Sequence, residues 1–249
     1  MNIEEIIAIA QKAGEATMEI YQRDFAVEYK DDKSPLTEAD LKANQIICDA
    51  LIKLYPTIPI LSEENKTIEY NERKDWGYYW CIDPIDGTKE FVKKNDEFTI
   101  NIALIHRDRP VAGVVYAPAL GDLYYAKQGE GAFKNGKKLP LQMNDKPQEH
   151  LSVVASKSHL STETQAFIDK LALSTQNLTL TSKGSSLKLC MIATGEADIY
   201  PRLAPTMEWD TAAADAIVRE AGKMTYQFDS EMAVVYNKEN LLNPWFIVK

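Results

Sequence analysis

The stretch YYWCIDPIDGTKE, residues 78–90, joins a run of mostly aromatic and β-branched residues to two aspartates. Residues 78–82 are typical of a buried strand. Asp83 and Asp86 follow directly, with only two residues between them. Carboxylates held this close repel each other, and burying them costs free energy unless a cation lies between them. The stretch therefore predicts a strand that ends in a cation-binding turn.

Proline and glycine give this turn its expected shape. Pro84 fixes its own φ and lacks an N–H, whereas Gly87 permits a sharp change of chain direction. We expect both aspartates and the carbonyl of Ile85 to point into one small volume. Thr88 is expected to begin a helix, whose free N–H groups can hold phosphate oxygens.

Further acidic residues lie at the edges of other predicted elements. They are Asp40 in TEAD (37–40), Glu63 and Glu64 in SEE (62–64), and Asp210 in EWD (208–210). Each has a structural alternative at this stage. Asp40 could complete a capping box with Thr37, Asp210 could be a plain N-cap before Thr211, and the glutamates could form a solvated turn.

Together these acids form a set of hard oxygen donors without histidine or thiolate, which suits Mg²⁺ rather than zinc. Mg²⁺ usually shares its coordination shell with water and substrate phosphate. Two such ions roughly 4 Å apart can clamp the attacking and leaving oxygens of a phosphoryl transfer. The pattern therefore predicts metal-assisted hydrolysis of a phosphate ester.

The composition excludes several other classes of protein. The chain has 249 residues and a formal net charge of -9, so a nucleic acid polymer is not an expected partner. The three cysteines are widely spaced, which argues against a disulfide framework. No apolar run approaches the ~20 residues of a membrane span. An acidic rather than basic N-terminus predicts a cytoplasmic location, and leaves a peripheral membrane contact open.

Hydrophobic periodicity and turn signals divide the chain into two predicted lobes. Residues 1–145 read as an α+β lobe that carries most of the acids, and residues 146–249 as an α/β lobe that carries Asp210. Predicted helices cover 3–21, 37–54, 161–172, 185–194 and 211–221. Predicted strands cover 25–30, 58–61, 78–82, 98–105, 111–117, 122–126, 151–156, 178–182, 197–202 and 245–249.

The motifs TEAD, SEE, WCIDPIDGT and WDTAA, in this order over residues 37–214, resemble the lithium-sensitive, magnesium-dependent phosphatases of the inositol monophosphatase superfamily. The resemblance implies a layered αβαβα sandwich and two or three Mg²⁺ ions. The metal ligands that it implies are Glu63, Asp83, the carbonyl of Ile85, Asp86 and Asp210. It also implies direct in-line attack by water, with no covalent intermediate.

The resemblance implies roles for neighbouring residues as well. Asp40 and Thr88 match the pair that orients the attacking water and helps to deprotonate it. Glu64 matches an acid that acts through water or a third ion. Gly87 and Thr88 match phosphate contacts.

Within the superfamily, DGTKEF (86–91) departs from the DGTxNF usual in inositol monophosphatases. It is similar to the 3′(2′),5′-bisphosphate nucleotidases, as are GSSLKLC (184–190), ADIYPRL (197–203) and LNPWF (242–246). This resemblance implies hydrolysis of adenosine 3′,5′-bisphosphate to AMP and phosphate, which clears a by-product of sulfate assimilation.

A bisphosphate brings a second anionic group that the metal ions do not reach. Lys188 follows a glycine-serine turn suited to phosphate, and Arg202 can bind phosphate bidentately. The resemblance places Ser185, Lys188 and Arg202 against the nucleotide, and His159 near the adenosine. The structural alternatives are an exposed helix lysine, a strand-end cap and a surface histidine.

Two other functions stay open on the sequence alone. An inositol or sugar monophosphatase of the same superfamily would use the same acids, and GSSLK is the segment that favours the nucleotide. A phospholigand sensor without catalysis would not need the pair Asp40 and Thr88. The sequence does not specify the oligomeric state.

Overall fold

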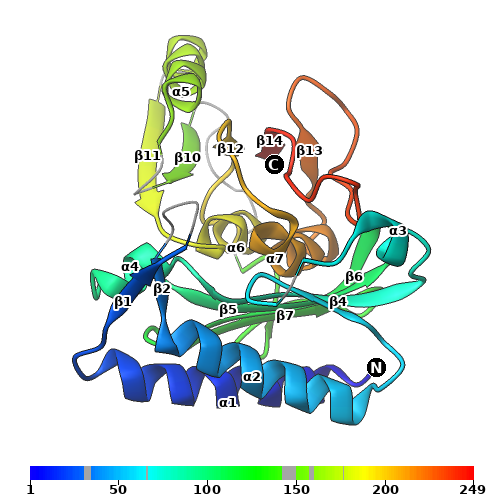
Figure 1. The fold of residues 1–249 in the computed structure, drawn as a ribbon. Coiled ribbons are helices and arrows are strands. Elements are labelled where there is room, and N and C mark those ends of the chain that lie inside the picture. Colours follow the sequence, from blue (N-terminus) through cyan, green and yellow to red (C-terminus); the bar gives the residue numbers. More distant parts are fainter. Residues whose placement is uncertain (31–34, 66, 142–149, 157–159, 176) are drawn as a thin grey trace.

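The computed structural model describes all residues from 1 to 249 except 31–34, 66, 142–149, 157–159 and 176. The elements form a stack of layers (Figure 1). From bottom to top in that view, α1 and α2 lie under a large sheet, α6 and α7 lie over it, and smaller sheets and α5 complete the stack. This is the layered αβαβα sandwich that the sequence resemblance implies.

The lowest layer is a pair of helices, α1 (Ile3–Tyr21) and α2 (Glu38–Leu54). Each begins at a side-chain cap: Asn2 accepts from the N–H of Glu4, and Thr37 accepts from the N–H of Ala39. Their apolar faces are buried against the sheet in one hydrophobic cluster. A short hairpin of β1 (Val27–Tyr29) and β2 (Pro35–Thr37) leads from α1 into α2.

The central layer is a seven-stranded sheet in the order β3-β4-β5-β6-β7-β8-β9. All neighbours pair antiparallel except β3 and β4, which are parallel. The strands are β3 (Ile60–Ser62), β4 (Tyr78–Asp86), β5 (Thr99–His106), β6 (Arg109–Ala117), β7 (Asp122–Lys127), β8 (Gly131–Lys134) and β9 (Lys137–Lys138). A short helix, α3 (Tyr70–Arg73), precedes β4, and α4 (Thr88–Val92) follows it.

Both faces of this sheet are buried, because helices cover each of them. Side chains alternate along β4, so Trp80 and Ile82 pack toward α1 and α2, whereas Tyr79 and Cys81 belong to the cluster that includes α6 and α7. Asp83 continues the second series. The alternation therefore directs this carboxylate toward the α7 side of the sheet.

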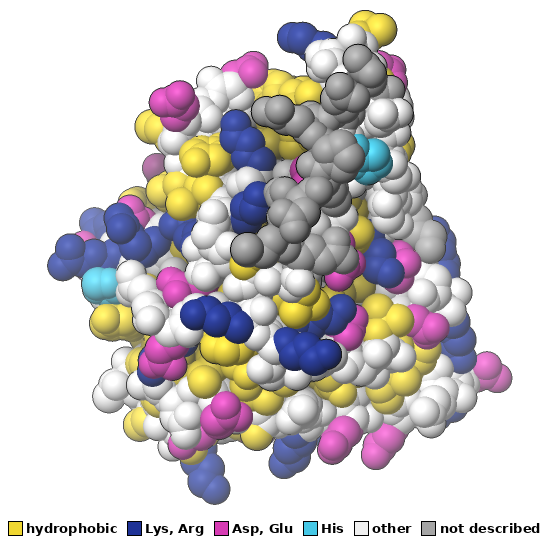
Figure 2. Space-filling view, turned by 180° about the vertical axis from the view of Figure 1, so that it is seen from behind, with side chains coloured by type: hydrophobic (Ala, Val, Ile, Leu, Met, Phe, Trp, Pro, Cys, Tyr) yellow, Lys and Arg dark blue, Asp and Glu magenta, His cyan; other side chains and the backbone are white. Residues whose placement is uncertain are grey.

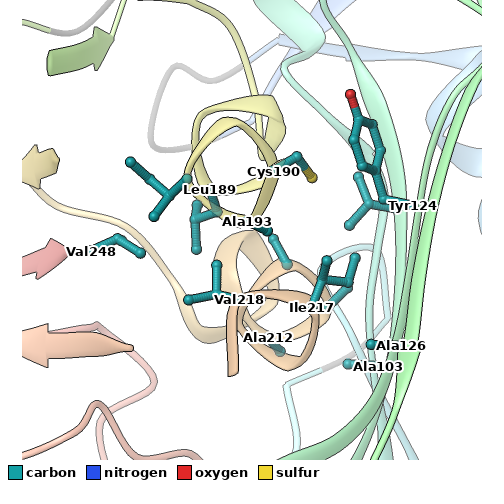
Figure 3. Packing of buried hydrophobic residues seen from close by; sticks show 14 of the residues in the cluster. Ala103, Tyr124, Ala126, Leu189, Cys190, Ala193, Ala212, Ile217, Val218 and Val248 are labelled. Carbon is teal, nitrogen blue, oxygen red and sulfur yellow. The ribbon is translucent and has the colours of Figure 1, made fainter. Parts of the chain in front are cut away.

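Helices α6 (Leu187–Thr194) and α7 (Glu208–Glu220) pack closely on the sheet because small residues line the contact. A Cβ added to Gly113 of β6 would lie 2.1 Å from the carbonyl oxygen of Ala213. Figure 3 shows Ile217 of α7 and Cys190 of α6 on the side of these helices that faces the sheet. Leu189 lies on the opposite side of α6, toward Val248. The close packing of α7 on the sheet brings the start of α7 next to the end of β4.

Two small sheets form the next layer. One pairs β10 (His150–Ser156) with β11 (Asn177–Lys183) in parallel, and α5 (Thr162–Ser174) connects them. The other has the order β12-β14-β13, formed by β12 (Tyr200–Arg202), β14 (Phe246–Val248) and β13 (Thr225–Gln227). The segment between the end of β12 and α7 thus comes down toward the central sheet (Figure 1).

Most predicted elements occur, with ends shifted by a few residues, but one start is wrong. The last long helix begins at Glu208 rather than at residue 211, so Asp210 lies inside its first turn. The predicted division at 145/146 falls within 142–149, outside the described residues, and the two lobes stay a prediction. α6 and α7 nevertheless pack on the sheet that the first segment builds.

The surface agrees with the charge of the sequence. On the face drawn in Figure 2, Asp and Glu side chains are interspersed among Lys and Arg. Among the described residues, no helix is long and apolar enough to cross a bilayer.

Candidate active site

The DPID turn is a bulge at the end of β4. Asp83 pairs with Asn101 of β5 and Asp86 pairs with Thr99, so β4 has one more residue than β5 over this interval. The N–H of Ile85 donates to Oδ1 of Asp83 at 3.1 Å. Gly87 then adopts a φ of 90°, and α4 begins at Thr88 as predicted.

Three elements bring their carboxylates together at this bulge. One carboxylate oxygen from each of Glu63, Asp83 and Asp210 lies within 4.8 Å of the other two. Glu63 follows β3 and is tied to β4, because its N–H donates to the carbonyl of Ile82 at 3.2 Å. Asp210 comes from the first turn of α7. The structure therefore brings these distant acids together, and their role as metal ligands stays a prediction.

Asp210 is not the N-cap that the sequence left open. It is the third residue of α7, and its Oδ2 accepts from the N–H of Met207 at 2.7 Å. The carboxylate thus stabilises the helix start with one oxygen.

Burial and mutual repulsion disfavour negative charge in this cluster. Burial raises the pKa of Asp83 well above its ordinary value, and the charges of Glu63 and Asp86 raise it further. Burial, with Asp86 and Glu63, raises the pKa of Asp210 to about 8. Burial also raises the pKa of Glu63. Such a site favours a cation that offsets the charge of the ionised carboxylates.

Asp86 is oriented by residues of two other elements. The Ser186 hydroxyl lies 2.6 Å from Oδ2 of Asp86, and the Asn101 amide donates to that hydroxyl at 2.8 Å. Ser186 Oγ is also 2.8 Å from the carbonyl of Asp210. This network connects β5, α7 and the turn before α6. Burial raises the pKa of Asp86, although Lys188 and the Ser186 hydrogen bond oppose the rise.

Asp40 makes the contacts that both of its predicted roles require. Its Oδ2 accepts from the N–H and hydroxyl of Thr37 at 2.8 and 2.6 Å, which completes a capping box. Its Oδ1 lies 3.1 Å from the hydroxyl of Thr88. Thr88 Oγ1 is also 3.2 Å from the carbonyl of Ile85. The cap therefore fixes the carboxylate that faces Thr88.

Glu64 lies beside the cluster, and a residue that the sequence did not single out holds it there. Lys30 Nζ lies 2.7 Å from Glu63 Oε1 and 2.6 Å from Glu64 Oε1. Burial disfavours the charge of this lysine, but the two carboxylates raise its pKa overall. Lys30 follows a short strand in a polar stretch, and no sequence pattern connects it with SEE, 33 positions later.

A cavity of about 270 Å³ opens over the cluster. Its walls include acids of the cluster, the turn after β4, the turn before α6 and residues of the small sheets. The predicted residues in its lining are Glu63, Asp83, Ile85, Asp86, Gly87, Thr88, Ser185, Lys188, Arg202 and Asp210. The structure thus brings the two predicted groups, acidic and basic, into one cavity.

The basic wall is more buried than the structural alternatives for its residues require. Lys188 is 6% exposed and Arg202 is 9% exposed, so Lys188 is not a solvated helix lysine. Lys188 Nζ donates to the carbonyl of Ser185 at 2.5 Å and lies 5.6 Å from the Tyr200 ring centroid. Burial lowers the pKa of Lys188 to about 8, against the attraction of Asp86. His159, the remaining predicted contact, lies outside the described residues.

The cluster fits a hard divalent cation. Its donors are carboxylate oxygens from three elements, Ile85 also lines the cavity, and no sulfur or imidazole ligand occurs among the described lining residues. Oxygen donors of this kind suit Mg²⁺. The raised pKa values mean that a bound cation would displace protons from these carboxyls.

Comparisons with known proteins agree with this geometry. The family model described as the inositol monophosphatase family matches residues 2–244. The chain is 42% identical to the 3′(2′),5′-bisphosphate nucleotidase CysQ of Salmonella typhimurium, over 99% of this chain and 98% of the relative. It is 40% identical to the CysQ nucleotidase of Escherichia coli K12 with the same coverage.

Solved structures give the same result. The crystal structure of CysQ from Bacteroides thetaiotaomicron matches with a TM-score of 0.89 and 44% identity, over 99% of this chain and 96% of that one. An IMPase of Thermotoga maritima matches with a TM-score of 0.81 and 29% identity, over 99% of this chain and 91% of that one.

Proposed function

Because this chain belongs to the inositol monophosphatase family, we propose that it is a 3′(2′),5′-bisphosphate nucleotidase of the CysQ type. It hydrolyses adenosine 3′,5′-bisphosphate to AMP and phosphate and requires Mg²⁺. The observation that carries this proposal is that the carboxylate cluster and the buried cations Lys188 and Arg202 line the same cavity. A substrate with two phosphates complements both walls.

The acidic cluster is the proposed metal site. The residues that would bind Mg²⁺, as two or three ions, are Glu63, Asp83, the carbonyl of Ile85, Asp86 and Asp210, with Glu64 at the edge through Lys30. When bound, Mg²⁺ supplies positive charge that stabilises the oxygens of the transferred phosphoryl group. Ser186 and Asn101 fix the orientation of Asp86 before the substrate arrives.

Asp40 and Thr88 move the proton of the attacking water. With its hydroxyl hydrogen directed to Asp40 Oδ1, Thr88 presents a lone pair that accepts a hydrogen bond from water. The proton lost by water passes to the Thr88 oxygen as the Thr88 proton passes to Asp40. Burial raises the pKa of Asp40, which makes this carboxylate a better base. Water attacks directly, so no covalent intermediate forms.

The remaining residues bind the substrate. The N–H groups of Gly87 and Thr88 lie at the start of α4, where they suit the phosphate that is cleaved. Ser185, Lys188 and Arg202 bind the phosphate that is kept, and His159 contacts the nucleoside. Lys188 keeps most of its charge at pH 7, because its pKa is about 8. The cytoplasmic location stays a prediction.

Phosphate release from adenosine 3′,5′-bisphosphate tests the proposal. The wild-type protein should release phosphate with Mg²⁺ and none with a chelator. Asp83→Asn is the matched control, because it keeps the side-chain size and removes one buried charge. We expect it to lose activity by about 10³-fold or more while its thermal unfolding stays cooperative. Equal turnover by the variant would contradict the site.

A further inference from the structure

Two turns from distant parts of the sequence meet across the cavity. One is the turn at Gly87 that follows the acidic cluster, and the other is Gly184–Ser185–Ser186 before α6. A Cβ added to Gly87 would lie 3.2 Å from the Cβ of Ser185 and 3.2 Å from the carbonyl oxygen of Glu97. The spacing between the turns therefore depends on what supports the second turn from behind.

Glu97 provides that support. Its Oε2 accepts a hydrogen bond from the N–H of Gly184 at 2.9 Å, and its Oε1 lies 3.3 Å from Lys183 Nζ. The Glu97 side chain is 13% exposed and does not itself line the cavity. The Glu97 carboxylate thus contacts both Lys183 and Gly184, the residues that lead into the turn.

The packing around Gly184 leaves no room for the turn to move toward Glu97. A Cβ at Gly184 would lie 2.7 Å from the Glu97 carbonyl oxygen and 2.8 Å from Cγ of Glu90. Only glycine therefore fits here without displacement. Gly184 therefore packs closely against Glu90 and Glu97.

The segment that carries Glu97 is itself anchored. The Tyr21 hydroxyl of α1 donates to Oδ1 of Asp96 at 2.8 Å and accepts from the N–H of Asp96 at 3.1 Å. Asp96 has a φ of 67° and Lys94 a φ of 52°, so the backbone here is held in a left-handed conformation that non-glycine residues rarely adopt. The N–H of Glu97 donates to Oδ1 of Asn95 at 3.1 Å.

The residue next to Gly184 needs such support. Ser185 has a φ of 45°, again in the left-handed region, and is 8% exposed. Its carbonyl accepts the hydrogen bond from Lys188 Nζ, so the place of that ammonium depends on the conformation of Ser185. Strained backbone of this kind persists where the surrounding structure fixes it.

We propose that Glu97 is a positioning residue for bisphosphate specificity. Through the N–H of Gly184 it fixes Ser185, and through Ser185 it fixes the ammonium of Lys188 against the phosphate that is not cleaved. The inference rests on the proposed function, because it assigns that phosphate to the basic wall. Glu97 is not among the described residues that line the cavity over the acidic cluster.

Kinetics with two substrates test this role. Glu97→Ala should raise the KM for adenosine 3′,5′-bisphosphate by about tenfold and leave kcat within about twofold, because it loosens binding and not the acidic cluster. Adenosine 3′-monophosphate lacks the second phosphate, so its KM should change by less than about twofold. An equal rise in KM for both substrates, or a loss confined to kcat, would overturn the proposal.

Matched variants separate the two contacts of Glu97. Glu97→Gln keeps an oxygen that accepts from the N–H of Gly184 and should retain the wild-type KM. Lys183→Met removes the ion pair and keeps that hydrogen bond, so it should also behave as wild type. If Glu97→Ala does not fold, Glu97→Asp, which withdraws the carboxylate by one methylene, should raise the bisphosphate KM in the same selective way.

Amide hydrogen exchange gives a readout that does not need activity. In Glu97→Ala, the segment around Gly184 should exchange faster than in wild type, with the exchange of β4 unchanged. Unchanged exchange near Gly184 would overturn the positioning role. If wild type fails to hydrolyse the bisphosphate, the proposed function and the specificity role both fail. The exchange result then still decides whether Glu97 holds the turn.

Discussion

The hydroxyl of Thr88 lies 3.1 Å from Oδ1 of Asp40, 48 positions earlier in the chain. The other oxygen of Asp40 is held by the N–H and hydroxyl of Thr37, so the carboxylate cannot turn away. One side chain thus forms the helix cap and the contact with Thr88 on which the proposed proton relay depends. This explains why a local reading of TEAD as a capping box and a catalytic reading are both consistent with the structure.

Removing the Thr88 hydroxyl should abolish the relay while the metal cluster persists. We expect Thr88→Ala to lower kcat by about 10²- to 10⁴-fold, the usual contribution of a positioned proton acceptor. Thr88→Ser keeps the hydroxyl and is the matched control, with activity near that of wild type. Steady-state kinetics with Mg²⁺ measure both, and full activity of Thr88→Ala would exclude the relay.

Asp40→Asn should impair both turnover and stability. The amide cannot accept the proton from Thr88, and its nitrogen is a poor partner for the N–H of Thr37 if it faces that way. We expect unfolding to become easier by about 1 kcal/mol, which is typical of a lost cap. Urea unfolding beside kinetics checks this, and a variant with lower activity but unchanged stability would argue against the shared role.

The acidic cluster makes the effect of Mg²⁺ on stability depend on pH. The pKa of Asp210 rises from an ordinary carboxyl value to about 8 in the folded protein. The folded state therefore holds more protons than the unfolded chain between about pH 4 and pH 8, and its stability falls as pH rises through this window. If Mg²⁺ binds the deprotonated folded cluster as proposed, it should offset this loss.

Thermal unfolding at several pH values measures this coupling. The rise in Tm on addition of Mg²⁺ should be larger at pH 8 than at pH 5. Asp210→Asn, which removes one titrating carboxyl of the cluster, should reduce the difference between the two pH values. A stabilisation by Mg²⁺ that is the same at both values would show that these carboxyls are not its ligands.

Close packing of α7 on the sheet should make Gly113 intolerant of a side chain. Gly113→Ala places a methyl group 2.1 Å from the Ala213 carbonyl oxygen, so either α7 or β6 must move. We expect a loss of about 1–3 kcal/mol in the free energy of unfolding, typical of overpacking. Gly77→Ala is the matched control, because a Cβ there meets no atom of the described residues within 4 Å.

Local patterns predicted the turn at the end of β4, because proline, glycine and the strand before them are sequence neighbours. The family resemblance carried by the ordered motifs, and not local pattern, implied that Glu63, Asp83 and Asp210 belong to one site, and their carboxylates lie together. The start of α7 at Glu208 was missed, since Asp210 looked like a cap before the apolar run at residue 211. The hydrogen bond from the N–H of Met207 to Oδ2 of Asp210 identifies Asp210 as the third residue of the helix.

Contacts between distant segments could not be predicted. Lys30 reaches Glu63 and Glu64 from just after β1, and Glu97 reaches Gly184 from the loop before β5. Each of these side chains looks like an ordinary surface charge in the sequence. Only the layered packing decides which charges become buried partners.

The ratio of kcat/KM for adenosine 3′,5′-bisphosphate to that for inositol 1-phosphate, measured side by side with saturating Mg²⁺, tests the central claim most directly. The basic wall of Lys188 and Arg202 has a phosphate to bind in the first substrate and none in the second. We predict a preference for the bisphosphate of about 100-fold or more, since only this substrate brings a second phosphate that can form charge-assisted hydrogen bonds with these two cations. Equal turnover, or a preference for inositol 1-phosphate, would contradict the account.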